Sequence, residues 1–160
     1  MVISRIDVIH SDIVSINSVA LRFGVSIPKV NYDAITTDGH IISDYGVMFV
    51  KKDTLRNTYN TTSIADAYRD GRELAAVHSN TGTISHVDGY NYFFTAKIKI
   101  TLESNYNTYY CAAPFIVIDD EYYFLPQMEA SVSNIAWSEY YGYTSNTTFS
   151  KAALHILIGI

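Results

Sequence analysis

The first residue that could act in catalysis is the single cysteine, Cys111, which lies in the apolar run YYCAAPFIVI at 109–118. A reactive cysteine needs a base close to its sulfur, and no histidine of this chain stands in a known cysteine-enzyme signature. A free cysteine among aromatic and small residues on a strand usually packs as a small hydrophobic side chain. We therefore predict that Cys111 belongs to the core.

The five histidines are spread along the chain at His10, His40, His78, His86 and His155. They form no HExxH or HxH motif and no helical i,i+4 pair, so a zinc site would have to be assembled from distant parts. His40 and His86 both lie in expected loops, which leaves open a small hydrolase built from these two residues and loop carboxylates. We expect surface histidines instead, and no enzymatic activity.

Two acidic stretches are similar to cation sites. The segment DAYRDG at 66–71 begins like a calcium-binding loop, but Tyr68 takes a ligand position and Val77 stands where the bidentate glutamate is needed. The second stretch is the acidic run Asp119, Asp120 and Glu121. Calcium requires about 6–8 oxygen ligands, so a solvated turn is the better interpretation of this run. We predict no metal and no cofactor, with these three residues as the only candidate ligands.

Tyrosine is present in excess, with 14 residues in a chain of 160. Exposed tyrosines offer rigid contact area with a polar tip, and they suit protein interfaces and sugar stacking alike. The candidate binding residues near strand ends, in loops and after the last expected helix are Tyr90, Tyr92, Tyr106, Tyr109, Tyr140, Tyr141 and Tyr143. The alternative is that most of these rings are buried at sheet edges with the hydroxyl in water.

Alternation of apolar and polar residues predicts the strands that position these side chains. Residues 16–27 alternate cleanly, and residues 93–102 do the same with Leu102 on the inward face. Residues 44–51 are apolar on both faces, which is typical of a central strand. Residues 2–9 form a weaker opening strand.

Residues 107–125 are predicted to form a β-hairpin. Cys111 and Phe115 fall on one face of its first strand. Asp119 and Asp120 form a two-residue loop, because aspartate tolerates the positive φ of such turns. Pro114 has no amide hydrogen to donate, so it should mark a bulge or a position whose amide side faces outward.

Helices are expected to be few and short. Residues 62–71 and 131–142 each carry an apolar stripe at helical spacing, with a serine that can cap the N-terminus and a glycine at the end. The tail at 150–160 alternates as a strand would, yet its composition favours a helix. The polar segments 28–43 and 79–91 are expected to be exposed loops.

Composition limits the size of the protein and the partners that it can have. A chain of 160 residues with 48% hydrophobic content fits one domain, 1–160. The net charge of -5 and the scattered basic residues argue against nucleic acid. Arg5 and Asp7 interrupt the N-terminal segment, which argues against a secretory signal. No apolar run approaches the roughly 20 residues that cross a bilayer.

Several short strands with few helices predict an all-β fold, an antiparallel β-sandwich whose sheets bury their apolar faces on one another. An ordered set of segments resembles an immunoglobulin-like β-sandwich module of large bacterial surface proteins and phage structural proteins. These segments are ALRFG (20–24), DYGVMF (44–49), GYNYFFTAKI (89–98), YYCAAPFIVIDDEYYF (109–124) and SVSNIA (131–136). The resemblance spans most of residues 16–136 and consists of packing residues.

The resemblance implies a non-enzymatic structural or adhesive module that makes protein-protein contacts at a surface. Such modules are normally one part of a long protein, whereas we expect this chain to stand alone, without a secretory signal. We therefore expect a phage virion component of the head or tail, working as a homo-oligomer or within a larger assembly of virion or surface-layer proteins. A carbohydrate-binding or host-adhesion domain on a bacterial cell surface is the alternative.

Overall fold

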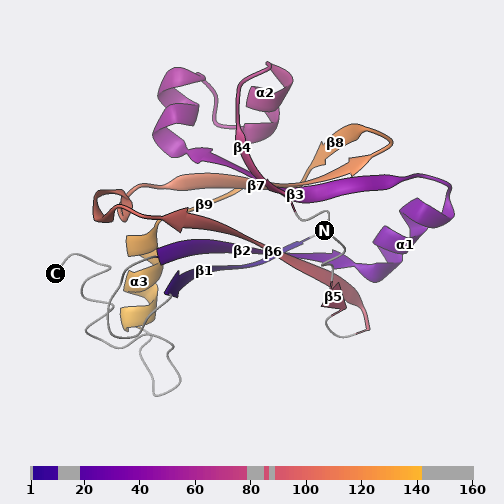
Figure 1. The fold of residues 1–160 in the computed structure, drawn as a ribbon, viewed down its shortest axis with the longest axis horizontal. Coiled ribbons are helices and arrows are strands. Elements are labelled where there is room, and N and C mark those ends of the chain that lie inside the picture. The colour runs from indigo at the N-terminus through magenta and orange to yellow at the C-terminus, as the bar shows by residue number, and fades with distance from the viewer. Residues whose placement is uncertain (1, 11–18, 79–84, 87–88, 142–160) are drawn as a thin grey trace.

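The structure, a computed structural model, describes residues 2–10, 19–78, 85–86 and 89–141, which form two antiparallel sheets and a few short helices (Figure 1). The first sheet has the order β1-β2-β6-β5, with bounds Val2–His10, Val19–Pro28, Asn91–Ile100 and Ser85–His86. The second has the order β4-β3-β7-β8 with β9 beside β7, and bounds Ala75–His78, Ile42–Lys51, Tyr110–Ile118, Glu121–Phe124 and Met128–Ala130. The helical elements are α1 (Lys29–Thr37), the π-turn η1 (Thr54–Thr58), α2 (Ile64–Arg69), the 3-10 turn η2 (Glu103–Asn105) and α3 (Val132–Tyr141).

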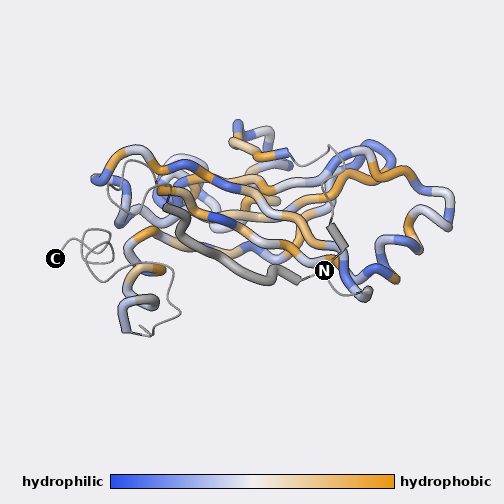
Figure 2. Tube along the Cα trace, turned by 60° about the horizontal axis from the view of Figure 1, so that its bottom comes forward, coloured by the Kyte–Doolittle hydropathy of each residue, from blue (hydrophilic) through white to orange (hydrophobic). Residues whose placement is uncertain are grey.

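The main hydrophobic core lies between the two sheets, and alternation along the strands builds it. The inward side chains of β2 and β6 are buried, and the Tyr45 ring of β3 meets the Phe94 ring of β6 with centroids 5.0 Å apart. Hydrophobic and hydrophilic residues accordingly follow one another along these strands (Figure 2). The all-β prediction is confirmed. The inward placement of Leu102 is wrong, because β6 ends at Ile100 and Leu102 is 59% exposed beyond it.

The second sheet is buried on both faces, so the fold has a third, helical layer. The outer side chains of β7, among them Cys111 and Phe115, form a second cluster with Leu55 of η1 and with Ile64 and Ala67 of α2. Figure 1 shows α2 lying over that sheet on the side away from β2 and β6. Cys111 is thus a core residue, as predicted, and burial raises the pKa of its thiol.

The predicted hairpin is confirmed in its strands, its faces and its turn. β7 pairs with β8 across Asp119 and Asp120, whose φ angles of 51° and 68° are both positive, as in a type I′ turn. Pro114 does not cause a bulge, since its pairing with β3 runs without a register shift. Its carbonyl accepts from the Leu125 amide at 2.8 Å, so its amide side faces the gap between β8 and β9, where no donor is needed.

Both predicted helices are present, and each begins with the expected serine cap. The Ser63 hydroxyl accepts from the Asp66 amide at 3.2 Å at the start of α2. The Ser131 hydroxyl accepts from the Asn134 amide at 3.1 Å at the start of α3. These bonds satisfy backbone donors that a helix N-terminus otherwise leaves unpaired.

The expected loops are only partly correct. Segment 28–43 contains α1, which a Lys29 to Asp33 ion pair of 3.3 Å and the packing of Tyr32 against the core stabilise. The sequence of this segment favoured a loop because it carries no wide apolar stripe. The contact that anchors α1 is instead made with residues far away in the chain. Segment 79–91 includes the two-residue strand β5, and its residues 79–84 and 87–88 lie outside the described residues. The tail at 150–160 also lies outside them.

Candidate functional site

An open groove of about 590 Å³ lies between α2 and the β7–β8 hairpin. We call it the aromatic groove and define it by Tyr68, Arg69, Asp120, Glu121, Tyr122 and Phe124. Its volume is in the range of about 300–1,000 Å³ that is typical of ligand pockets. It combines several aromatic rings with charged side chains, and it is larger than the hollow of about 310 Å³ beside α1 and the hollow of about 230 Å³ at the hairpin tip.

The aromatic side of the groove comes from two elements that the chain brings together. Tyr122 and Phe124 alternate along β8 and therefore share a face, with ring planes 27° apart and centroids 6.4 Å apart. Tyr68 approaches from α2, and its ring centroid lies 4.8 Å from that of Tyr122 and 5.4 Å from that of Phe124. Phe115 supports Tyr122 from below at 5.3 Å. All three groove rings are half-buried.

Buried contacts and hydrogen bonds hold α2 in place beside the hairpin. Ile64 and Ala67 of α2 are fully buried. The Gln127 side chain accepts from the Ile64 amide at 2.8 Å and donates to the Thr62 carbonyl at 2.9 Å. Gln127 lies in the short segment between β8 and β9, so these two bonds tie the start of α2 to the chain just after the strand that carries the other rings.

Charged groups of both signs line the rim of the groove. Arg69 is an exposed residue of α2 whose guanidinium pairs with Asp66 at 3.1 Å. Glu121 accepts from the hydroxyl of Tyr123 at 3.0 Å, and that hydrogen bond raises the pKa of the Tyr123 hydroxyl. Asp120 completes the rim from the hairpin turn. The rim can therefore both donate and accept hydrogen bonds.

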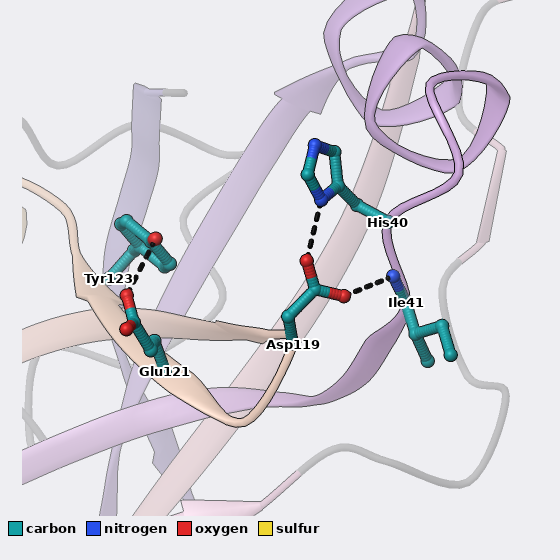
Figure 3. Close-up of polar contacts among 5 residues, drawn as sticks. All are labelled: His40, Ile41, Asp119, Glu121 and Tyr123. Atoms are coloured by element: carbon teal, nitrogen blue, oxygen red, sulfur yellow. Dashed lines mark hydrogen bonds and ion pairs between the residues drawn. The ribbon is translucent and has the colours of Figure 1, made fainter.

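A histidine–aspartate pair lies at the hairpin tip beside this rim (Figure 3). His40 Nδ1 lies 2.5 Å from Asp119 Oδ2, and Asp119 Oδ1 accepts from the Ile41 amide at 2.9 Å. Figure 3 shows Asp119 directed toward His40, whereas Glu121 is directed toward Tyr123. The three acidic candidates thus do not converge on one point. Among the described residues, no three metal-ligating side chains gather in a cluster.

A second such pair joins β4 to β3. His78 Nδ1 lies 2.6 Å from Asp44 Oδ2, and Asp44 Oδ1 accepts from the Tyr45 amide at 2.8 Å. The His78 and Phe115 rings also meet in a T-shaped contact at a centroid distance of 5.4 Å. Sequence reasoning found neither pair, because residues 34 and 79 positions apart in the chain form them.

We predict that Asp119→Asn reduces stability near neutral pH but not in strong acid. The Ile41 amide and then the His40 ring hold the pKa of the Asp119 carboxyl below its ordinary value of 3.8. A carboxyl whose pKa is lower when folded adds stability above its unfolded pKa, and this contribution disappears as the pH falls through the folded pKa. Asparagine keeps an oxygen for Ile41 and tolerates the positive φ, so the variant removes mainly the charge.

The measurement is urea denaturation of wild type and Asp119→Asn between about pH 6 and pH 2, because the free energies of unfolding should converge below the ordinary aspartate pKa. Asp38→Asn, at an exposed position after α1, is the control for the loss of one surface carboxylate. If the difference in free energy of unfolding between wild type and Asp119→Asn stays constant over this pH range, the charge of Asp119 does not stabilise the fold in the way proposed.

The tyrosines proposed from the sequence do not form one surface. Tyr90 is 79% exposed beside α1, whereas Tyr106 is only 6% exposed and belongs to the core, where burial raises the pKa of its hydroxyl. Tyr109 is 38% exposed, and Lys52 Nζ lies 5.5 Å from its ring centroid. Tyr143 lies outside the described residues.

The other candidates are held by neighbours within the chain. The Tyr92 hydroxyl donates to Asp33 Oδ1 at 3.0 Å, and this bond raises the pKa of that hydroxyl. On α3 the Tyr141 ring stacks on Trp137 at 5.2 Å, and Tyr140 meets Tyr141 edge-on. α3 and the start of β6 lie at opposite ends of the molecule (Figure 1), so these residues cannot share one ligand.

Sequence reasoning missed the residues that do gather. The signal for Tyr122 and Phe124 is present, since EYYF alternates around a predicted hairpin. No local pattern connects them to Tyr68, which stands more than fifty positions earlier. The suggested hydrolase site at His40 and His86 stays untested, because the side chain of His86 lies outside the described residues.

Comparison with protein-family models, curated proteins and solved structures found no match. The immunoglobulin-like resemblance therefore stays a prediction, and function has to be argued from geometry. Within the described ranges, no helix is long and apolar enough to cross a membrane.

Proposed function

We propose that this chain is a non-catalytic structural and adhesive module of the immunoglobulin-like kind, a phage virion component that acts through protein-protein contacts in a repeated assembly. The antiparallel two-sheet body is compatible with that module, although its helical third layer departs from a plain two-layer sandwich. A carbohydrate-binding adhesion domain is the second candidate, and the aromatic groove is the observation that favours it.

The observation that supports assembly is a group of exposed apolar side chains at one end of the molecule. Val30 of α1, Ile41 after it and Tyr90 before β6 are 74%, 69% and 79% exposed. Val30 and Tyr90 line the same hollow of about 310 Å³, and the Lys29 amide donates to the Tyr90 carbonyl at 2.7 Å. We call this group the α1 end, which lies at the right of Figure 1.

Large apolar side chains exposed at one end of a molecule favour burial against a partner. A second copy of the chain in a symmetric assembly supplies such a partner, and repetition multiplies contacts that are individually weak. The exposed His40–Asp119 pair supports this contact surface, because it holds the segment before Ile41 against the hairpin tip. It bonds to no hydroxyl or thiol among the described residues, which gives the hydrolase alternative no further support.

Self-association measured by analytical ultracentrifugation tests this proposal. We expect wild type to associate with rising concentration and Val30→Glu to associate about tenfold more weakly, because a buried, unpaired carboxylate is costly. Leu102→Glu is the matched control, since Leu102 is also an exposed apolar residue but follows β6 at the other end of the molecule. A wild-type chain that stays monomeric at the highest concentration contradicts the assembly.

A further inference from the structure

We propose that the aromatic groove is a glycan-binding site that takes a neutral pyranose unit of a cell-surface oligosaccharide. The inference rests on the non-catalytic, adhesive role proposed above, and it names the class of ligand that such a module would hold. Neither the residues nor the place of this site coincide with the tyrosines singled out from the sequence.

The groove offers a surface for each part of a sugar ring. A pyranose ring has C–H groups on one face and hydroxyls around its rim. The C–H face is apolar and packs on the negative face of an aromatic ring. The groove supplies half-buried rings at Tyr68, Tyr122 and Phe124, so part of each ring is already dry while part remains open to a ligand.

The aromatic rings of the groove lie against one another. Tyr122 and Phe124 are close to parallel, with planes 27° apart and centroids 6.4 Å apart along β8. The Tyr68 ring packs against Tyr122 at 4.8 Å, inclined by 38°, and lies 5.4 Å from Phe124. The three rings thus form one cluster beside the groove, and they offer a sugar more apolar contact area than a single exposed tyrosine does.

The rim of the groove is polar. Hydroxyl groups both donate and accept, so a sugar needs acceptors and donors at the edge of the stacking surface. Asp120 provides a carboxylate acceptor, and Arg69 provides a guanidinium donor. Hydrogen bonds to charged groups are about twice as strong as those between neutral groups. Because both signs of charge are present, the rim suits a neutral sugar better than an ion.

The groove is ordered before a ligand binds, and a site of this kind loses less entropy on binding. The groove is built on a strand and on a helix, and Gln127 ties the two together through Ile64 and Thr62. Phe115 is fully buried below Tyr122 and limits the movement of its ring. The rings therefore stand in place without a ligand.

The test begins with a printed array of bacterial cell-surface oligosaccharides, followed by titration calorimetry with the strongest neutral binder. We expect Tyr122→Ala and Arg69→Ala each to weaken binding about tenfold or more, as for a lost stacking face or a lost charged hydrogen bond. Arg69 is 71% exposed, so its variant leaves the core intact if Tyr122→Ala fails to fold.

Two matched controls lie outside the groove. Tyr59→Ala removes another half-buried tyrosine that packs on the same second cluster, and Arg56→Ala removes another exposed arginine above the same sheet. Both should leave the measured dissociation constant within about twofold of wild type.

The outcomes separate this inference from the function on which it rests. The inference is overturned if no neutral glycan binds, if only peptides bind, or if Arg69→Ala binds the glycan as wild type does. If binding follows the groove variants while sedimentation shows only monomers, the site stands and the assembly does not. Cleavage of the bound glycan would overturn the non-catalytic role.

Discussion

Phe115→Ala is expected to lower the free energy of unfolding by about 3–5 kcal/mol, the cost of emptying a phenylalanine site in a packed core. Phe115 is 0% exposed and lies between the second sheet and α2. Its ring meets His78 at 5.4 Å and Tyr122 at 5.3 Å, so the cavity would border both the His78–Asp44 pair and the aromatic groove. Two strands and a helix surround this site, which limits how far it can collapse.

Urea denaturation followed by circular dichroism measures this loss. Tyr123→Ala is the control, because Tyr123 is 49% exposed on the neighbouring strand β8 and should cost less than about 1 kcal/mol. A loss of stability for Phe115→Ala no larger than that of the control would show that the helical layer does not pack as described.

Gly46→Ala is expected to cost about 2–3 kcal/mol or more, because a side chain there has no room. A Cβ atom at Gly46 would overlap the carbonyl oxygen of Val77 and lie 2.9 Å from the Phe115 ring and 3.1 Å from the Cα of His78. β3 lies between β4 and β7, so backbone on one side and a buried ring on the other prevent relief. The glycine is required by close approach of two strands, and its φ is not positive.

The same denaturation experiment tests Gly46→Ala against Gly39→Asn. Gly39 has a φ of 88° and open space where a Cβ would stand, and asparagine tolerates such angles better than other residues. The control should stay within about 1 kcal/mol of wild type. If Gly46→Ala is equally mild, β4 does not approach β3 as closely as the structure shows.

The fold places the two proposed surfaces on different elements, which makes them separable by mutation. The aromatic groove lies between α2 and β8, whereas the α1 end is built by α1 and the start of β6. The β7–β8 turn borders both, since Asp119 bonds to Ile41 and Asp120 lines the groove. Substitutions at Arg69 and Val30 therefore report on one surface each.

The sequence by itself determined the strands and their faces. Along β7, alternation separates Cys111 and Phe115 from Tyr110 and Ala112, and the structure buries each pair in a different cluster. This succeeds because side chains of a strand alternate with a period of two whatever the partner strand is. The Asp119–Asp120 turn could also be predicted from the sequence, because its backbone conformation depends on the residues within it.

Only the tertiary structure decided what meets across the chain. α1 was missed because its anchor, the contact of Tyr32 with Tyr92 at 5.0 Å, joins segments sixty positions apart. The histidine–aspartate pairs and the groove of Tyr68 with Tyr122 have the same character. The type of a residue determines which groups it can bond to. Which distant residue lies near it in the folded chain depends on the strand order and on how the helices pack on the sheet.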